Sequence, residues 1–303
     1  MKSNSYHLDH LEYLETEAIH VMREVAGGFE RPAILFSGGK DSICLLRLAE
    51  KAFRPADIPM PLLNVETGHE FPELLDFRDR RAKQLGAKLI VSTVDEAIAK
   101  GTAIITKGNV SRNRLQIPAL LSAIEENRFD CCIGGARRDE EKARAKERFF
   151  SFRDGFGQWD PKNQRPEIWN LYNARLNPGE NMRVFPLSNW TEMDVWQYIH
   201  LENIPIVPLY YAKEREVLVR GNSLIMPEQS FMGPRDGEKL QTVKCRMRSL
   251  GCSPCTGAIR SDADTIPKII AELVAVRNSE RENRVIDHDR EGSMELKKRE
   301  GYF

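Results

Sequence analysis

Residues 33–42 read Ala-Ile-Leu-Phe-Ser-Gly-Gly-Lys-Asp-Ser, and this stretch decides the fold. Its first four residues are typical of a buried strand, and the apolar residues after it recur at helical spacing: Ile43, Leu45, Leu46, Leu48 and Ala49. The two glycines between these patterns allow a sharp turn at the start of the helix. Free N–H groups and the helix dipole favour an anion there. The stretch therefore predicts a strand, a phosphate-binding loop and a helix.

Side chains of the loop strengthen this interpretation. Lys40 brings a full positive charge, and Ser37 and Ser42 bring hydroxyl donors. The loop is too short for a Walker A sequence, which has four residues between its first glycine and its Gly-Lys pair, so a P-loop kinase or ATPase is disfavoured. An ordinary glycine turn is the alternative, but the combination of residues from Ser37 to Ser42 favours anion binding.

Outward from this loop, short apolar runs alternate with helical patterns. We expect strands at 33–36, 61–65, 88–92, 130–134 and 183–185, and helices at 8–26, 41–53, 70–86, 113–127, 139–147 and 191–203. The alternation predicts an α/β fold with a parallel central sheet of about five strands, helices on both faces and an irregular C-terminal region. We divide the chain into a nucleotide-binding domain, 1–204, and a C-terminal region, 205–303, expected to cover the active site and bind a partner.

In a parallel sheet, ligands bind beyond the carboxyl ends of the strands. Three loops are expected to emerge there: Ser37–Ser42, Glu66–His69 and Gly134–Arg137. The sequence thus predicts that three distant segments converge on one crevice. His69 is a candidate to polarise an oxygen, although such a histidine is more often exposed or bonded to a neighbour.

The segment from Arg137 to Arg148 is a second chemical signal. On a helix, Arg138, Lys142 and Lys146 would form a ladder of like charges that repels itself unless an anion lies among them. Because acidic residues are interspersed, a solvated helix of mixed charge is an equal alternative. Arg112 likewise either closes over an anion or caps a helix in solvent.

Cys245, Cys252 and Cys255 form a C-x6-C-x2-C pattern that suits a metal or an iron–sulfur cluster. The pattern has only three thiols and no histidine, so structural thiols are favoured, with a metal or redox site as the alternative. Cys131 and Cys132 are expected to be buried on opposite faces of a strand.

Two other segments have structural interpretations. Thr191 with Asp194 resembles a capping box that starts a helix, and Trp196 and Ile199 on that helix are expected in the core. The stretch from Phe149 to Tyr172 is rich in aromatic residues and proline, and it is either a self-packed loop or a surface that docks another protein.

The composition limits the class of protein. The 303 residues are 41% hydrophobic and 30% charged, with 45 Lys and Arg against 45 Asp and Glu. The net charge is zero, so the protein as a whole does not attract nucleic acid or an anionic membrane. An anion-binding site therefore has to come from a local cluster of residues. The charged N-terminus is expected to be a docking helix rather than a signal peptide. With no run of the roughly eighteen apolar residues that span a bilayer, and no disulfide framework, we expect a cytoplasmic protein.

The SGGKDS loop resembles the signature of the PP-loop ATP pyrophosphatases, which grip the β and γ phosphates of ATP while a nucleophile attacks the α phosphorus. Longer stretches resemble one branch of that family, the small catalytic subunits of bacterial sulfate adenylyltransferases. These are REVAGGFERP at 23–32, GGARRDEEKARAKER at 134–148, FSFRDGFGQWDPKNQRPE at 150–167, RVFPLSNWTEMDVWQYI at 183–199 and GSMELKKREGYF at 292–303.

This resemblance implies an enzyme that joins sulfate to the α phosphate of ATP, releasing pyrophosphate and forming adenosine 5′-phosphosulfate. The implied cofactors are ATP, as substrate, and Mg²⁺. The implied partner is a large GTPase subunit built like a translation elongation factor, whose GTP hydrolysis would drive synthesis; neither nucleic acid nor a membrane is expected. Sulfate is already ionised, so catalysis has to come from positioning and charge neutralisation.

The resemblance also assigns residues in the basic segment. The implied catalytic set is Lys40, Asp41, Arg137, Arg138 and Asp139. The residues expected to bind ATP or sulfate lie in the three loops, near residue 112 and in the basic segment: Ser37, Gly38, Gly39, Lys40, Asp41, Ser42, Glu66, Thr67, Gly68, Arg112, Gly134, Gly135, Lys142 and Arg144. No residue is assigned to ligate a metal directly, and Asp41 is a candidate outer partner of Mg²⁺.

Three other functions compete with this one. A phosphoadenylylsulfate reductase shares the implied fold but carries Glu-Cys-Gly-x-His near its end, and residues 297–303 have no such motif, so we reject it. An ATP-dependent sulfur-insertion enzyme acting on tRNA or DNA would adenylate its target with the same loop and carry sulfur on the cysteines; it is the main alternative. A non-catalytic scaffold for a GTPase is the third.

Overall fold

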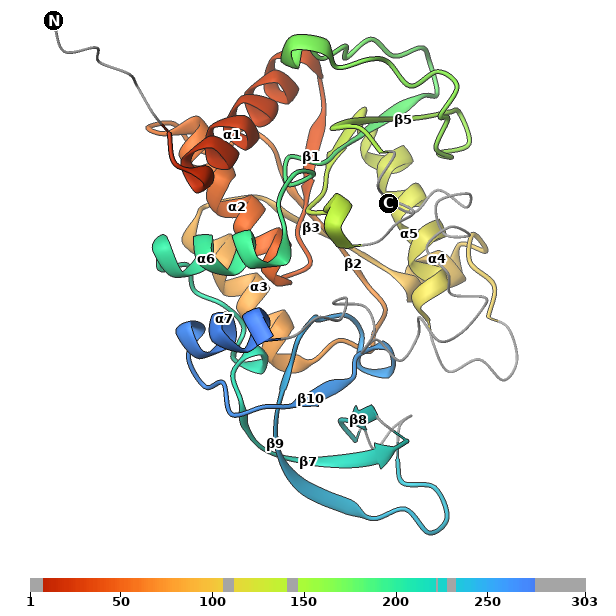
Figure 1. The fold of residues 1–303 in the computed structure, drawn as a ribbon. Coiled ribbons are helices and arrows are strands. Elements are labelled where there is room, and N and C mark those ends of the chain that lie inside the picture. Colours follow the sequence, from red (N-terminus) through yellow and green to blue (C-terminus); the bar gives the residue numbers. More distant parts are fainter. Residues whose placement is uncertain (1–7, 106–111, 141–146, 222, 228–232, 276–303) are drawn as a thin grey trace, which may run out of the picture.

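The computed structural model describes residues 8–105, 112–140, 147–221, 223–227 and 233–275. Its centre is a six-stranded sheet (Figure 1) with the order β3-β2-β1-β4-β6-β5. The strands are β1 Pro32–Leu35, β2 Leu62–Glu66, β3 Leu89–Thr93, β4 Cys131–Ile133, β5 Phe150–Arg153 and β6 Asn181–Val184. Neighbouring strands are parallel except for β5, which runs antiparallel to β6. The predicted α/β fold is confirmed.

The five expected strands all form, and β5 is an addition that the sequence analysis missed. Phe150 and Phe152 lie in the core, and Ser151 and Arg153 on the alternate positions are buried as well. Arg153 is paired with Glu147 at 3.1 Å, and both are buried. A strand signal rests on alternation between apolar and solvent-facing polar residues, and here the polar residues also face inward.

Helices cover both faces of the sheet. They are α1 His10–Gly28, α2 Lys40–Phe53, α3 Pro72–Gln84, α4 Val94–Ala99, α5 Gln116–Asn127, α6 Glu192–Leu201 and α7 Ile266–Ala275. Side chains of α1, α2, α3 and α6 share one large apolar core, whereas α5 packs on the opposite face with Ala33, Leu35 and Cys132. Of the helix expected at 139–147, the structure describes one 3-10 turn, Arg138–Glu140, and residues 141–146 lie outside the described ranges.

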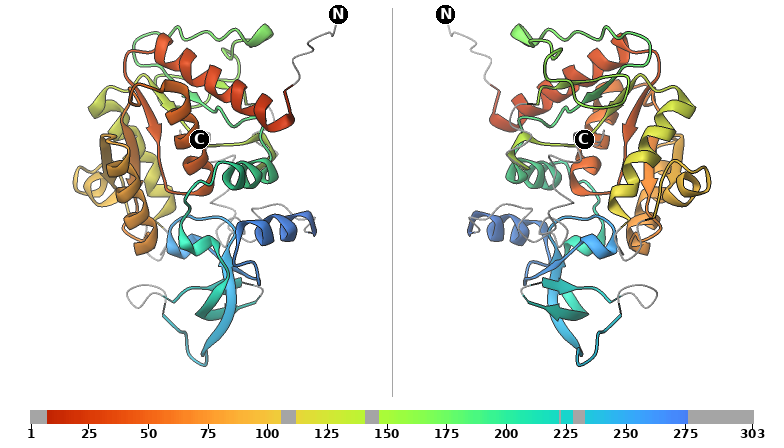
Figure 2. Two further views of the ribbon diagram at one scale, coloured as in Figure 1. Left: turned by 90° about the vertical axis from the view of Figure 1, so that its left-hand side faces the viewer. Right: turned by 90° about the vertical axis from the view of Figure 1, so that its right-hand side faces the viewer.

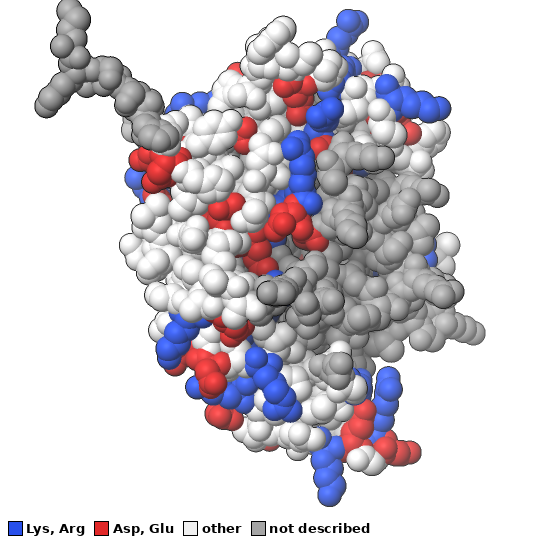
Figure 3. All heavy atoms as spheres, in the orientation of Figure 1, with Lys and Arg blue, Asp and Glu red and all other residues white. Residues whose placement is uncertain are grey.

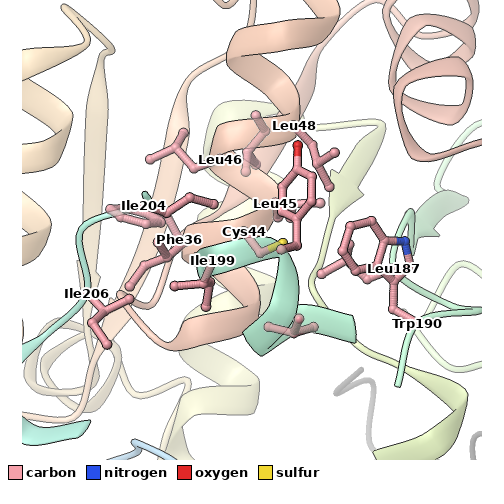
Figure 4. Close-up of a cluster of buried hydrophobic side chains, with 14 of the residues drawn as sticks. Phe36, Cys44, Leu45, Leu46, Leu48, Leu187, Trp190, Ile199, Ile204 and Ile206 are labelled. Carbon is pink, nitrogen blue, oxygen red and sulfur yellow. The ribbon is translucent and has the colours of Figure 1, made fainter. Parts of the chain in front are cut away.

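The core around α2 holds the SGGKDS loop in place. Figure 4 shows Phe36, at the end of β1, together with Leu45 of α2 and Ile199 of α6. All three are essentially inaccessible to solvent, and burying each such side chain contributes about 1.5–3 kcal/mol. The start of α2 therefore packs against both the sheet and α6.

Helix α6 begins where the sequence predicts. Thr191 Oγ1 accepts from the amide of Asp194 at 3.1 Å, and Asp194 Oδ2 accepts from the amide of Thr191 at 2.8 Å. This reciprocal pair is the predicted capping box. Trp196 and Ile199 lie in the core, as expected.

The described part of the C-terminal region is more regular than the sequence predicts. It contains β7 Lys213–Arg220, β8 Ser223–Ile225, β9 Leu240–Met247 and β10 Ala258–Arg260, which close into an antiparallel barrel with the order β10-β8-β7-β9. Both views of Figure 2 place these strands at one end of the molecule. Closure leaves few exposed strand edges, which explains how such short strands persist.

The surface agrees with the balanced composition. On the face in Figure 3, basic and acidic side chains are interspersed over the described residues. Within the described ranges, no helix is both long and apolar enough to cross a membrane.

Candidate active site

Strand register brings the three predicted loops to the same edge of the sheet. Ile34 of β1 pairs with Ile133 of β4, so Ser37 and Gly134 leave the sheet at the same edge. On the other side of β1, Leu35 pairs with Leu63 of β2. The loop after β2 therefore leaves from this edge too, which is the carboxyl edge of the parallel strands.

The SGGKDS loop is folded as a compact cradle. Gly38 has a φ of +76°, a conformation that favours glycine, and a Cβ there would lie 2.8 Å from Leu74 Cδ1, so the end of the Leu74 side chain would also have to shift. Gly39 caps α2 without a side chain. Ser42 Oγ donates to the carbonyl of Gly39 at 2.9 Å, and Ser37 Oγ lies 3.2 Å from Ser42 Oγ. The serine hydroxyls thus stabilise the turn that presents the first amides of α2.

Two buried cations meet one carboxylate at this helix start. Lys40 Nζ lies 3.4 Å from Asp41 Oδ2, and Arg137 Nε donates to Asp41 Oδ1 at 2.6 Å. Lys40 and Arg137 are each only 1% exposed, whereas the Asp41 side chain is 26% exposed. The two cations therefore place positive charge in the buried part of the cradle, and the positive end of α2 adds to it.

The loop after β4 packs directly on this helix start. A Cβ on Gly135 would lie 3.1 Å from the carbonyl carbon of Asp41 and 3.2 Å from the amide nitrogen of Ser42. Asp139 lies farther out, with Oδ2 3.7 Å from Arg137 Nη1. The same oxygen accepts from the amide of Glu192 at 3.3 Å, at the start of α6. Of the residues carried over by resemblance, Arg137 and Asp139 are thus placed beside the cradle.

The loop after β2 is held by a residue that the sequence analysis missed. Glu70 accepts from the amides of Thr67, at 2.7 Å, and Gly68, at 3.0 Å. Its position three residues after Thr67 is a capping-box spacing that could have revealed it. Glu66 is turned towards α3, where Arg78 Nη1 lies 2.5 Å from its Oε1. The Glu66 carboxylate is therefore engaged in a structural ion pair.

Arg112 approaches this loop from the other side. A Cβ on Gly68, which has a φ of +81°, would lie 2.8 Å from Arg112 Nη1. Arg112 is paired with Asp95 of α4, and its hydrogen bond lowers the pKa of the Asp95 carboxyl. Asp95 thus holds the guanidinium over Gly68, at the rim of the candidate site.

Arg138, one of the predicted catalytic residues, is not brought to the cradle. Arg138 turns away from Arg137: its Nη1 donates to Asn189 Oδ1 at 2.8 Å and its Nε to the carbonyl of Glu147 at 3.1 Å. The guanidinium also lies over the ring of Phe149. Lys142 and Arg144 fall outside the described residues.

Tyr210 is a member of the site that no sequence signal indicated. It belongs to a 3-10 turn, Pro208–Tyr210, and its hydroxyl accepts from the amide of Lys40 at 2.8 Å. The side chain is 1% exposed and packs edge-on against Trp196. The C-terminal region therefore contributes directly to the cradle.

A second contact from the C-terminal region reaches the loop after β2. The amide of Ser253, between Cys252 and Cys255, donates to the carbonyl of His69 at 2.7 Å. In the part of the chain that the structure describes, no three His, Cys, Asp or Glu side chains are placed to hold a metal ion together. Cys245 therefore does not complete a metal site with Cys252 and Cys255.

The chain is similar over most of its length to proteins of one family. Residues 31–258 match the model of the phosphoadenosine phosphosulfate reductase domain family. The sulfate adenylyltransferase subunit 2 of Bacteroides fragilis is 55% identical over 98% of this chain and 99% of its own length. The protein of that name from Halorhodospira halophila is 54% identical over 100% of both chains.

Among solved structures, phosphoadenylyl-sulfate reductase from Candida auris superposes with a TM-score of 0.43 at 16% identity, over 68% of this chain and 91% of its own. FMN adenylyltransferase from Candida glabrata gives 0.47 at 15% identity, over 76% and 73%. Because the family model spans most of the sequence and the relatives match it end to end, the chain belongs to the phosphoadenosine phosphosulfate reductase domain family and, within it, to the subunit 2 enzymes of sulfate adenylyltransferase.

Proposed function

We propose that this chain catalyses the attack of a sulfate oxygen on the α phosphorus of ATP, which forms adenosine 5′-phosphosulfate and releases pyrophosphate. The observation that carries the proposal is the meeting of Lys40, Asp41 and Arg137 at the N-terminus of α2, beside a loop that requires glycine. Relatives that match the whole chain are named for this reaction. The two lines of support are independent.

The cradle suits the leaving group. Backbone amides of the loop, with Lys40 and Ser42, would hold the β and γ phosphates, because amides at a helix start and a buried ammonium stabilise negative charge. Arg137 would offset the charge that develops between the α phosphate and sulfate. No general base is needed, since sulfate is already ionised. The rate gain would come from alignment and charge neutralisation.

The neighbouring loops supply the walls. Gly135 lets the loop after β4 approach the helix start closely, and Gly134 packs against Phe185. Thr67, Gly68 and Arg112 would line the opposite side. We assign the nucleoside to that opposite side, because the Glu70 carboxylate already occupies the amides of Thr67 and Gly68 and leaves them unsuited to a phosphate.

Mg²⁺ would enter with ATP. Asp41 is the carboxylate at the cradle, and since its two oxygens already face Lys40 and Arg137, it fits contact through water better than direct ligation. When bound, the ion would supply positive charge that neutralises part of the charge on the phosphates.

The partner belongs to the same proposal. The relatives' name, subunit 2, implies a companion subunit, and we propose that it is the elongation-factor-like GTPase. Because the phosphosulfate anhydride is a high-energy product, equilibrium opposes its synthesis. GTP hydrolysis in the companion would drive it.

The test is formation of adenosine 5′-phosphosulfate from ATP, Mg²⁺ and sulfate, with and without the GTPase. We expect product only when sulfate and the GTPase are both present. Lys40→Ala should lower the rate by about 100-fold or more, since one preorganised charge contact is lost. Lys100→Ala is the matched control, because Lys100 pairs with Glu126 on the surface.

Two outcomes would contradict the proposal. Pyrophosphate release that ignores sulfate but requires a nucleic-acid acceptor would favour the sulfur-insertion enzyme. An absence of nucleotide turnover with the partner present would favour the scaffold.

A further inference from the structure

Cys252 and Cys255 have no part in the proposed reaction, yet their sulfurs are in contact. Cys252 Sγ donates to Cys255 Sγ over 2.7 Å across the 3-10 turn Ser253–Cys255. A disulfide bond measures about 2.05 Å, so the two sulfurs have to move together by less than about 1 Å to form one. Both residues are only 3% exposed.

The other cysteines are placed differently. Cys131 and Cys132 are adjacent in sequence, but they belong to the apolar cores on opposite faces of the sheet. Cys44 is part of α2 and lies in the core. Burial raises the pKa of each of these three thiols. The sulfur contact is therefore a property of the 252–255 turn.

This turn supports the loop after β2. The amide of Ser253 holds the carbonyl of His69, and Thr256 Oγ1 donates to the carbonyl of Cys252 at 3.0 Å. The hydrogen bond to Cys255, followed by burial and by the charge of Glu70, raises the pKa of Cys252 well above its usual range. Glu70 is the residue that binds the amides of Thr67 and Gly68. The two thiols thus lie directly behind one wall of the candidate site.

We propose that Cys252 and Cys255 are a reversible redox pair, which a small hydroperoxide oxidises to an intramolecular disulfide that restrains the loop after β2. When the turn opens, one thiol becomes hydrated and ionises, and the thiolate attacks the peroxide, giving a sulfenic acid and releasing water from hydrogen peroxide. The second thiol then attacks the sulfenic sulfur, so the S–S bond forms and a second water leaves. Two thiols lose two electrons and two protons, and the peroxide O–O bond is reduced.

The burial of Cys252 and Cys255 limits which oxidants can reach their sulfurs. A buried cysteine by itself is inert, but here brief opening of the turn admits a small peroxide, and the neighbouring sulfur captures the sulfenic acid at once. A bulky disulfide such as oxidised glutathione would need a larger opening. Once formed, the bond restricts the turn that holds His69, so local opening of the loop becomes rarer.

The experiment uses the whole protein, treated with hydrogen peroxide or with buffer. Blocking thiols with N-ethylmaleimide and mapping peptides by mass spectrometry should reveal a bond between Cys252 and Cys255, with a mass loss of about 2 Da that dithiothreitol reverses. Amide exchange in the peptide covering residues 65–71 should slow by about fivefold or more after oxidation. Neither measurement depends on ATP or sulfate, so failure here leaves the proposed reaction untouched.

Variants separate the pair from general oxidation. Cys255→Ser should lose both the bond and the change in exchange, whereas Cys245→Ser should keep both. Should Cys255→Ser fail to fold, the peptide map of the oxidised wild-type protein still decides. A sulfinic acid on Cys252, a bond to Cys245, or unchanged exchange in the oxidised protein would overturn the proposal.

Discussion

Asp41 is the residue on which the charge balance of the cradle depends. Lys40 and Arg137 are both buried, and a buried charge is tolerated only with a partner. Asp41 serves both, because one carboxylate oxygen faces each cation. An incoming phosphate would share these cations, so the cradle is preorganised for negative charge.

Gly135 allows the close approach on which this arrangement rests. In Gly135→Ala, the added methyl would press on the backbone of Asp41 and Ser42. We expect the rate of adenosine phosphosulfate formation to fall by about tenfold or more, since misplacement of about 1 Å is costly in a site that works by positioning. Stability should fall by about 1–3 kcal/mol in urea unfolding.

The matched control is Gly27→Ala, because nothing lies within 4 Å of a Cβ at that helical position. It should keep full activity and gain up to about 1 kcal/mol from helix propensity. Equal activity in the two variants would contradict the role given to Gly135.

At the level of elements, one ion pair in the barrel joins the end of β7 to the segment before β9. Arg220, at the end of β7, lies 2.9 Å from Glu238, which precedes β9. This contact and the amide of Arg235 lower the pKa of Glu238 to about 2. The pair closes the long connection between two strands whose direct pairing extends from Lys213 to Leu218.

The lowered pKa predicts a pH dependence. The native protein holds Glu238 ionised below the ordinary pKa of 4.5, so the stability it contributes is present above pH 4.5 and is lost as the pH falls towards about 2. The melting temperature of Glu238→Gln should therefore lie below that of the wild type at pH 7, and the difference should vanish near pH 2. High salt should reduce it, because the pair is only partly buried.

Glu214→Gln, on the exposed start of β7, serves as the control for removing one surface charge. If the melting temperatures of the wild type and Glu238→Gln still differ at pH 2, the substitution acts by some other route than loss of charge.

For the molecule as a whole, Tyr210 connects the C-terminal region with the cradle. In Tyr210→Phe, the buried amide of Lys40 loses its acceptor, which costs about 1–3 kcal/mol. We expect a loss of stability of that size together with a higher KM for ATP, because the first amide of α2 is no longer oriented. Chemical unfolding and initial rates measure the two effects.

Tyr211→Phe is the control, since Tyr211 is only partly buried and no hydrogen bond of its hydroxyl is found in the described ranges. A Tyr210→Phe protein with unchanged KM would show that the hydroxyl matters to folding alone.

The division of the chain between residues 204 and 205 into a nucleotide-binding domain and a C-terminal region stays a prediction.

An exposed apolar segment suits the proposed companion subunit. Trp169 is 85% exposed, between Ile168 and Leu171, which are more than half exposed. Trp169 and Asn170 both have a φ of +56°, an unusual conformation that turns this segment outward. We expect Trp169→Ala to weaken binding of the GTPase by about tenfold or more in a titration, with unchanged melting temperature.

Val274→Ala provides the comparison, because Val274 is also an exposed apolar residue, on α7. Equal binding by Trp169→Ala and the wild type would show that this segment faces solvent in the complex. The stretch from Phe149 to Tyr172 would then be a self-packed loop, the other interpretation of its sequence.

The local features were readable from the sequence because neighbouring residues determine them. The strand before SGGKDS, the glycine turn and the capping box of α6 all rest on spacing and backbone preference within a few residues. Alternation of strands and helices then placed the loops at one edge, because parallel strands share a direction. Fold class and the centre of the candidate site therefore followed from the chain alone.

Only the tertiary structure decided which distant groups complete that centre. Tyr210 reaches Lys40 across 170 positions, and Arg138 turns to Asn189 although its neighbour Arg137 meets Asp41. The pairing of β5 with β6 and the position of the 252–255 turn behind His69 likewise depend on how remote segments pack. The spacing of residues in the sequence does not reveal such contacts. The partners are distant along the chain and meet only because the whole chain folds, not because of any local preference.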